Sequence, residues 1–141
     1  MHVAIGFHPK KASQTPALRE QNLIAFRTLV QDSHVSAIGE VGLDFSESSH
    51  VWQDQEDLLN DLLPSEIDSK VLVLHCLGMG SGDSVYAIRH LLSILQRNNI
   101  PEHQPINFHC FTGNKLMEMW LPVYYNTYFG FTRLVKTYNK S

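Results

Sequence analysis

The sequence predicts an α/β fold, specifically part of a TIM-type (β/α)₈ barrel that holds about five of the eight βα units. Three observations support this prediction. Strand-like and helical segments alternate along the chain, the strands are almost continuously apolar, and polar residues recur at a regular spacing where successive strands end. The 141 residues are 43% hydrophobic and 18% charged, which is the composition of one globular domain.

Five short segments are expected to be strands because they are rich in Val, Ile or Phe and are bounded by Gly, Pro or polar residues. They are His2–Phe7, Val35–Val41, Val71–Cys76, Ile106–Phe111 and Thr127–Phe131. Strands that are apolar along most of their length are typical of a parallel sheet with helices packed against it. Such a sheet is either open and doubly wound or closed into a barrel.

Helical patterns lie between these strands. The first runs from Pro16 to about Gln31, with Thr15 as its N-cap and a proline at the first helical position, both of which are typical helix-start signals. The other three patterns cover Val51–Leu63, Ser84–Asn98 and Lys115–Leu121. The predicted order is therefore strand and helix in strict alternation, from the first strand to the fifth.

Polar side chains mark the C-terminal ends of the first four strands and favour the barrel. His8, Glu40, His75 and His109 follow one another at intervals of 32, 35 and 34 residues. One βα unit of a barrel of about 250 residues averages about 31 residues, and the active site of such a barrel lies at this end of the strands. By the same division, the chain holds about four and a half units. We therefore expect one domain over residues 1–141, truncated at both ends.

Glu40 is the strongest candidate for a catalytic residue. It lies in AIGEVGLDF, on a strand that otherwise carries no charge before its end, and a buried carboxylate needs a cation or several hydrogen bonds. His75 ends VLVLHC and His109 ends INFHC, and imidazole is a common metal ligand. A salt bridge for Glu40 and hydrogen-bonded core positions for the two histidines are the alternatives. Matched positions on three strands favour a metal site made of all three residues.

Two further residues are candidates for contacting substrate. His8 lies in GFHPK before Pro9, which holds it extended, so it either contacts a substrate phosphate or caps the turn. Asp44 follows Glu40 by four positions and either orients a ligand or begins a helix cap, with capping as the preferred interpretation. Cys76 cannot easily join His75 on one ion, because adjacent strand residues point to opposite faces.

Charge and cysteine content restrict the possible partners and location. The net charge is −3 and no basic run is longer than Lys10-Lys11. If nucleic acid is bound, metal ions or local clusters must therefore offset its phosphate charge, which indicates a site rather than a basic surface. Cys76 and Cys110 each follow a histidine in an apolar run, which suits buried, reduced thiols and predicts an intracellular protein, in nucleus or cytoplasm. No apolar run is long enough to cross a membrane, so no membrane partner is expected.

Four segments carry a family resemblance: GFHP, AIGEVGLDF, the strand that ends at His75, and HCFTG. Together they resemble the TatD family of metal-dependent deoxyribonucleases, in the family's order and spacing and over nearly the whole chain. The resemblance implies a barrel with two divalent metal ions, in which Glu40 bridges both ions while His75 and His109 hold the second. It further implies hydrolysis of phosphodiester bonds in DNA or RNA, with Mg²⁺ as the first choice of ion and Mn²⁺ or Zn²⁺ as alternatives.

The sequence also departs from the family pattern. The family holds its first metal with a His-x-His on the first strand and an aspartate near the last strand, and this sequence contains no His-x-His. Leu77 stands where the family usually has an arginine. We therefore expect this chain alone to be weak or inactive as a nuclease. The alternative is a non-catalytic fragment or degenerate paralogue that acts as a binding module. A different barrel hydrolase of the amidohydrolase type would favour a lysine metal bridge, which Glu40 speaks against.

Overall fold

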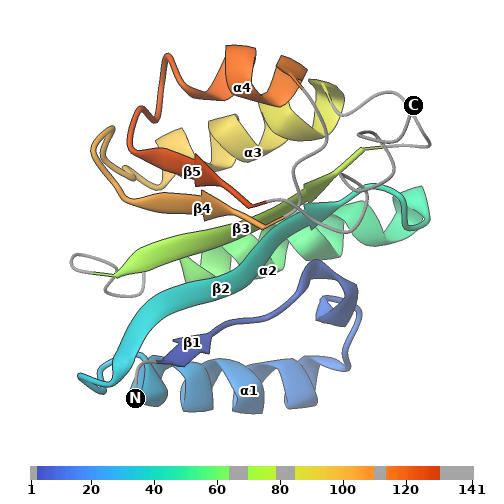
Figure 1. Cartoon of the computed structure of the whole chain (residues 1–141). Coiled ribbons are helices and arrows are strands. Elements are labelled where there is room, and N and C mark those ends of the chain that lie inside the picture. The colour runs from blue at the N-terminus through green and yellow to red at the C-terminus, as the bar shows by residue number, and fades with distance from the viewer. Residues whose placement is uncertain (1–2, 64–69, 79–84, 110–113, 131–141) are drawn as a thin grey trace, which may run out of the picture.

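A parallel sheet forms the centre of the protein, whose computed structural model describes residues 3–63, 70–78, 85–109 and 114–130. The sheet has the strand order β1-β2-β3-β4-β5, and every neighbouring pair is parallel (Figure 1). The strands are β1 Val3–Ile5, β2 Val35–Asp44, β3 Val71–Leu77, β4 Ile106–Phe108 and β5 Thr127–Phe129. Because every strand end faces the same edge of the sheet, residues that follow the strands gather at that edge.

Each pair of successive strands is connected through a helix. The α-helices are α1 Pro16–Leu29, α2 Trp52–Leu62, α3 Val85–Arg97 and α4 Asn114–Trp120, and short 3₁₀ helices occur at Pro9–Lys11 (η1) and Ser49–Val51 (η2). Right-handed crossovers between strands that advance in one direction place all the helices on one face. In Figure 1, α2 and α3 pass behind the strands. The strand order does not reverse as it does in a doubly wound sheet, which confirms the barrel-type prediction.

The hydrophobic core lies between the sheet and this helix layer. On β3, Leu72, Leu74 and Cys76 are fully buried, whereas Val71 and Val73 on the opposite face are more exposed. The core is completed mainly by apolar side chains of α2, α3 and α4, among them Leu58, Leu59, Leu62, Ile88, Leu91, Ile94, Leu95 and Trp120. Apolar residues thus cover one face of the sheet, and the other face is left for polar side chains near the strand ends.

A bulge in β2 sets the direction of the catalytic candidate. The pairing register between β2 and β3 shifts between Ile38 and Val41, so Glu40 lies at an irregular position of the strand. Beyond the bulge the strands come very close, because a Cβ atom added to Gly42 would lie 1.9 Å from the carbonyl oxygen of His75. A bulge of this kind bends a strand and redirects a side chain, and such bulges are frequent beside active sites.

The predicted elements are all present in the described residues, and their ends differ from the prediction by no more than three residues. The strand β2 continues to Asp44 because its pairing with β3 continues to Leu77. The predicted ends His2, Phe111 and Phe131 and the predicted helix start Ser84 lie outside the described residues. Among the helices of the described segments, none combines the length and apolarity that a membrane crossing requires.

Candidate metal centre

Four polar side chains meet at the C-terminal edge of the sheet, with Glu40 at the centre. Nδ1 of His75 lies 2.9 Å and Nε2 of His8 lies 3.2 Å from Oε1 of Glu40. Nε2 of His109 lies 3.4 Å from Oε2 of the same carboxylate. The structure therefore brings together His8, Glu40, His75 and His109, one from the end region of each of the first four strands, as the regular spacing in the sequence suggested.

Side chains of this cluster lie close enough together to bind one metal ion. One ligand atom from each of His8, Glu40 and His75 lies within 4.8 Å of the other two, and this group does not include His109. Separations of this size can close on one cation, because metal–nitrogen and metal–oxygen bonds of about 2 Å join ligands that are themselves about 3 Å or more apart. In the described part of the chain, every ion-pair partner of Glu40 is a histidine, so Glu40 has no lysine or arginine to neutralise it.

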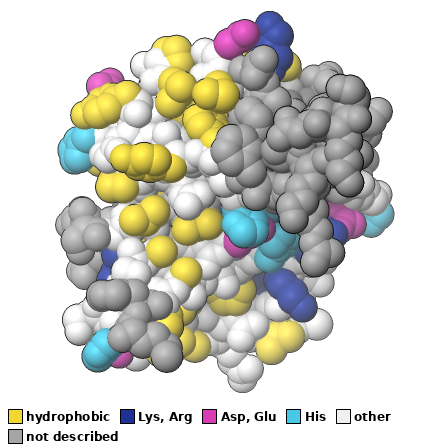
Figure 2. Space-filling view, in the orientation of Figure 1, with side chains coloured by type: hydrophobic (Ala, Val, Ile, Leu, Met, Phe, Trp, Pro, Cys, Tyr) yellow, Lys and Arg dark blue, Asp and Glu magenta, His cyan; other side chains and the backbone are white. Residues whose placement is uncertain are grey.

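Solvent exposure differs sharply among the members of the cluster. The side chain of His75 is 6% exposed, that of Glu40 is 22% exposed, and that of His109 is 61% exposed. Figure 2 shows histidine and acidic side chains together at the surface of this face of the molecule, beside several hydrophobic side chains. The cluster thus has a buried wall at β3 and opens to solvent on the side of His109.

His8 is held by the turn that it begins. It is the N-cap residue of η1, and its Nδ1 accepts a hydrogen bond from the backbone N–H of Lys10 at 3.2 Å. A neutral imidazole that accepts at Nδ1 carries its proton on Nε2, the atom that faces Glu40. Burial and then the neighbouring His75 lower the pKa of His8, against the opposing carboxylates Glu40 and Asp44. His8 therefore faces Glu40 as a hydrogen-bond donor, and its place as the N-cap of η1 confirms the turn-cap interpretation.

Asp44 lies behind His75. It is fully buried, its Oδ2 lies 3.1 Å from Nε2 of His75, and its Oδ1 accepts hydrogen bonds from the backbone N–H and the hydroxyl of Ser46. Burial alone would raise the pKa of Asp44, but the hydrogen bonds from Ser46 and His75 outweigh burial and lower it. The helix-cap interpretation is wrong, because the N-cap residues of η2 and α2 are Ser48 and Val51. A fully buried carboxylate with both oxygens engaged is also unable to contact substrate directly.

Gln55 of α2 is a site residue that sequence reasoning missed. It is buried, and its side-chain amide bonds both main-chain groups of Asp44: Oε1 accepts from the N–H at 2.8 Å and Nε2 donates to the C=O at 2.9 Å. The available signal was a glutamine on the apolar face of a helix whose other members are leucines. Such a residue needs buried hydrogen-bond partners, but the sequence does not indicate which ones.

The donor set is chemically consistent with a divalent metal ion. One carboxylate and several imidazoles supply oxygen and nitrogen ligands, which suit Mg²⁺ or Mn²⁺ through the carboxylate and Zn²⁺ through the imidazoles. Cys76 is buried among the helix-side residues, on the face of β3 opposite to His75. The expectation that it packs in the core is thus met, while Cys110 lies outside the described residues.

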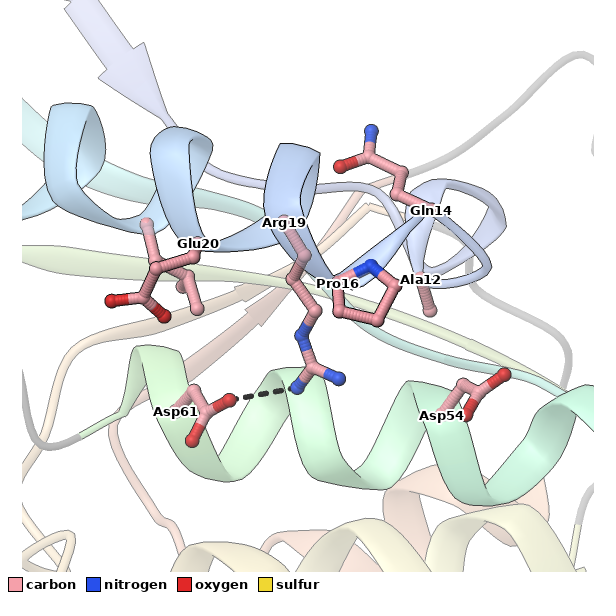
Figure 3. Close-up of a pocket in the computed structure, with 8 residues that line it drawn as sticks. Ala12, Gln14, Pro16, Arg19, Glu20, Asp54 and Asp61 are labelled. Carbon is pink, nitrogen blue, oxygen red and sulfur yellow. Dashed lines mark hydrogen bonds and ion pairs between the residues drawn. The ribbon is translucent and has the colours of Figure 1, made fainter.

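A separate cavity of about 320 Å³ lies between α1 and α2, away from the strand ends (Figure 3). Arg19 reaches across it from α1 and its Nη2 lies 2.7 Å from Oδ2 of Asp61 on α2. The remaining lining residues are Ala12, Gln14, Pro16, Glu20, Leu23 and Asp54. Since it contains none of the residues around Glu40, this cavity is not part of the metal centre.

Comparison with known proteins agrees with the fold and gives the family. The family model described as TatD related DNase matches residues 1–141. The crystal structure of YJJV, a TatD homologue from Escherichia coli, matches with a TM-score of 0.64 at 21% sequence identity, covering 91% of this chain and 45% of that chain. This chain thus spans less than half the length of that homologue, whose likeness shows the fold. No curated protein matches the sequence. The family match over the whole sequence, on a parallel sheet that carries a carboxylate–histidine cluster at its strand ends, establishes that this chain belongs to the TatD-related DNase family of metal-dependent hydrolases.

Proposed function

We propose that this chain contributes to the metal-dependent hydrolysis of phosphodiester bonds in DNA or RNA, at the site centred on Glu40. The observation that carries the proposal is the position of this carboxylate, which lies within 3.4 Å of a ring nitrogen of His8, His75 and His109 at the strand ends. The family match supports a nuclease as the reaction class. The two cysteines of the sequence, each in an apolar run, support an intracellular setting, in nucleus or cytoplasm.

Glu40, His75 and His109 are the proposed metal ligands. Glu40 supplies carboxylate oxygens, while His75 supplies Nδ1 and His109 supplies Nε2, the ring atoms that face that carboxylate. Mg²⁺ is the first choice for a nuclease of this family, with Mn²⁺ or Zn²⁺ compatible with the two imidazoles. When bound, a divalent ion lowers the pKa of a coordinated water and neutralises charge on phosphate oxygens.

His8 is proposed to hold the substrate rather than the ion. Its Nδ1 is engaged by the N–H of Lys10, so its Nε2 carries a proton. A metal ligand must offer a lone pair instead, whereas a protonated nitrogen can donate to a phosphate oxygen. Asp44 has no direct role toward substrate, because it is fully buried and lies behind His75.

We further propose that residues 1–141 are one TatD-like domain that requires flanking βα units for full activity. The chain corresponds to 45% of the matched homologue. Among the described residues, Glu40 supplies the one carboxylate of the clustered ligands, enough to hold one ion but not to place two ions against an attacking water. The 141-residue chain is therefore expected to hydrolyse nucleic acid weakly or not at all, and a longer polypeptide that restores the flanking strands is expected to be active.

The absence of His-x-His and the presence of Leu77 favour a second candidate function, binding without hydrolysis. Cleavage of labelled single-stranded DNA and RNA by the longer polypeptide, with Mg²⁺ or Mn²⁺ and with a chelator, separates the two. We expect chelator-sensitive cleavage that Glu40→Gln abolishes. Glu56→Gln is the matched control, because Glu56 also pairs with a histidine, His90, but does so outside the site. Cleavage that survives Glu40→Gln would refute the catalytic assignment, and binding without any cleavage would favour the second candidate.

A further inference from the structure

We propose that Gln55 and Asp44 form a positioning relay that fixes the ring of His75, so that Nδ1 faces the metal ion and Nε2 keeps its proton. The inference rests on the proposed metal site, since it assigns a function to residues that touch neither ion nor substrate. It runs from helix α2 through the end of β2 to the ligand on β3. Its three members, Gln55, Asp44 and His75, are all buried, and hydrogen bonds connect them.

The relay begins where the main chain of β2 lacks a strand partner on one side. Pairing of β1 with β2 ends at Ile38, while β2 remains paired with β3 as far as Asp44. The N–H of Phe45 bonds Leu77 of β3, so the N–H and C=O of the preceding residue Asp44 point to the opposite side. On that side, the side-chain amide of Gln55 accepts a hydrogen bond from the N–H of Asp44 at 2.8 Å and donates one to its C=O at 2.9 Å. Gln55 thus fixes the backbone of Asp44 in place of a neighbouring strand.

The second step fixes the carboxylate of Asp44. Its Oδ1 accepts from the backbone N–H of Ser46 at 3.1 Å and from the hydroxyl of the same residue. These two donors hold one oxygen and leave Oδ2 directed at Nε2 of His75, 3.1 Å away. Because Asp44 and His75 are both buried, solvent does not substitute for the contact between Oδ2 and Nε2. The carboxylate therefore has one available orientation.

The third step selects the ring nitrogen that meets the ion. An ionised carboxylate only accepts hydrogen bonds, so Nε2 of His75 must donate to Asp44. When the ring is neutral, its lone pair is then on Nδ1, and this atom lies 2.9 Å from Oε1 of Glu40. Two acceptor atoms then face each other, and a cation held between Glu40 and Nδ1 would satisfy both without disturbing the bond to Asp44. A carboxylate bonded to the outer nitrogen of a metal-bound histidine fixes the tautomer in this way in many metal sites.

Asp44→Asn provides the direct test. Ser46 donates twice to Oδ1, so the amide oxygen of the variant is expected to remain there and its NH₂ group to face Nε2 of His75. The ring must then carry its proton on Nδ1, the tautomer that is unable to bind the ion; a comparable Asp→Asn change in a Ser-His-Asp triad gives the wrong tautomer with intact geometry. We expect ¹H–¹⁵N correlation spectra, recorded for both proteins in the same Mg²⁺-containing buffer, to show Nε2–H for the His75 ring of the unchanged protein and Nδ1–H for that of the variant, with His75→Asn identifying its signals.

The affinity for a metal ion is the second measurement. Gln55→Met is compared with Gln104→Met as its matched control. Gln104 is also a buried glutamine whose amide bonds main-chain oxygens, those of Lys70 and Pro105, but these lie before β3 and β4, at the other edge of the sheet. Gln55→Met and Gln104→Met are expected to lower the melting temperature similarly. Only Gln55→Met and Asp44→Asn are expected to weaken Mn²⁺ binding in calorimetry, by about 10–100-fold.

The outcomes separate the relay from the proposed function. If the 141-residue chain binds Mn²⁺ and loses it in Glu40→Gln but keeps both its affinity and the Nε2–H tautomer in Asp44→Asn, the relay is overturned and the metal site stands. If Gln104→Met weakens Mn²⁺ binding as much as Gln55→Met, Gln55 acts only through overall stability and its place in the relay is overturned. If the folded chain binds no Mn²⁺ at all, both the proposed metal site and the relay are refuted.

Discussion

Nδ1 of His75 lies 2.9 Å from Oε1 of Glu40, although the two residues are on different strands. The contact depends on the bulge in β2 and on the closeness of β2 and β3 at Gly42, where the two main chains leave no space for a side chain. The geometry of the proposed ligands is therefore determined by the backbone, and the first of the following predictions concerns a residue that carries no functional group.

Gly42→Ala is expected to disrupt the metal centre. Its φ of +145° is a conformation that L side chains rarely adopt, and the new Cβ would lie 1.9 Å from the carbonyl oxygen of His75. We expect the free energy of unfolding to fall by about 2 kcal/mol or more, through backbone strain and forced separation of β2 and β3. Denaturant unfolding measures this change. Gly130→Ala is the control, since its nearest contact would be 3.1 Å; an equal loss in both variants would contradict the prediction.

Substitution of the two histidine ligands should separate stability from metal binding. His109→Ala removes a side chain that is 61% exposed, so the free energy of unfolding should change by no more than about 0.5 kcal/mol. His75→Ala leaves the buried carboxylate of Asp44 without one of its hydrogen-bond donors, which should cost about 1–3 kcal/mol. Both variants should weaken Mn²⁺ binding by more than about 10-fold in calorimetry. Unchanged affinity in His109→Ala would exclude it as a ligand.

Stability should decline in alkaline solution because of Tyr124. Burial, followed by the nearby Glu102, raises the pKa of Tyr124 to about 12, and its hydroxyl donates to the carbonyl oxygen of Ile100 at 3.1 Å. An unfolded tyrosine loses its proton near pH 10, so the unfolded state binds fewer protons than the folded state between about pH 10 and pH 12. The contribution of Tyr124 is therefore complete below about pH 10 and is lost as pH rises toward about 12.

Chemical denaturation at about pH 9 and about pH 11 measures this decline. In Tyr124→Phe the overall stability should be lower by about 1 kcal/mol at neutral pH, through the lost hydrogen bond, and the alkaline decline should be smaller. Tyr125→Phe is the control because Tyr125 is exposed. An undiminished decline in Tyr124→Phe would assign the effect to other groups.

Arg19→Met should leave both folding and metal binding almost unchanged. Arg19 pairs with Asp61 in the cavity between α1 and α2, and its Nε is buried without a hydrogen-bond partner in the described residues. A partly exposed ion pair contributes about 0–1 kcal/mol, and methionine retains much of the apolar stem while removing the unpartnered donor. The melting temperature and the Mn²⁺ affinity should therefore match those of the unchanged protein. A large loss of Mn²⁺ affinity would show that the cavity is coupled to the strand ends.

The sequence was sufficient to predict the elements and their class because the physical signals were local. An apolar run such as that of β3 defines a strand, and a carboxylate within such a run, as at Glu40, indicates that something must stabilise its charge. The roles of Asp44 and Gln55 could not be predicted in this way. They depend on where β1 stops pairing with β2 and on which carboxylate oxygen of Asp44 accepts the hydrogen bonds of Ser46. The sequence pattern does not specify either relationship.

The unequal exposure of His75 and His109 has a kinetic consequence. An ion or a chelator that enters or leaves the cluster encounters His109 first, whereas His75 is held in the wall by buried hydrogen bonds. Changes at His109 should therefore alter mainly the rate at which an ion enters the cluster, and changes at His75 should alter mainly how long a captured ion is retained.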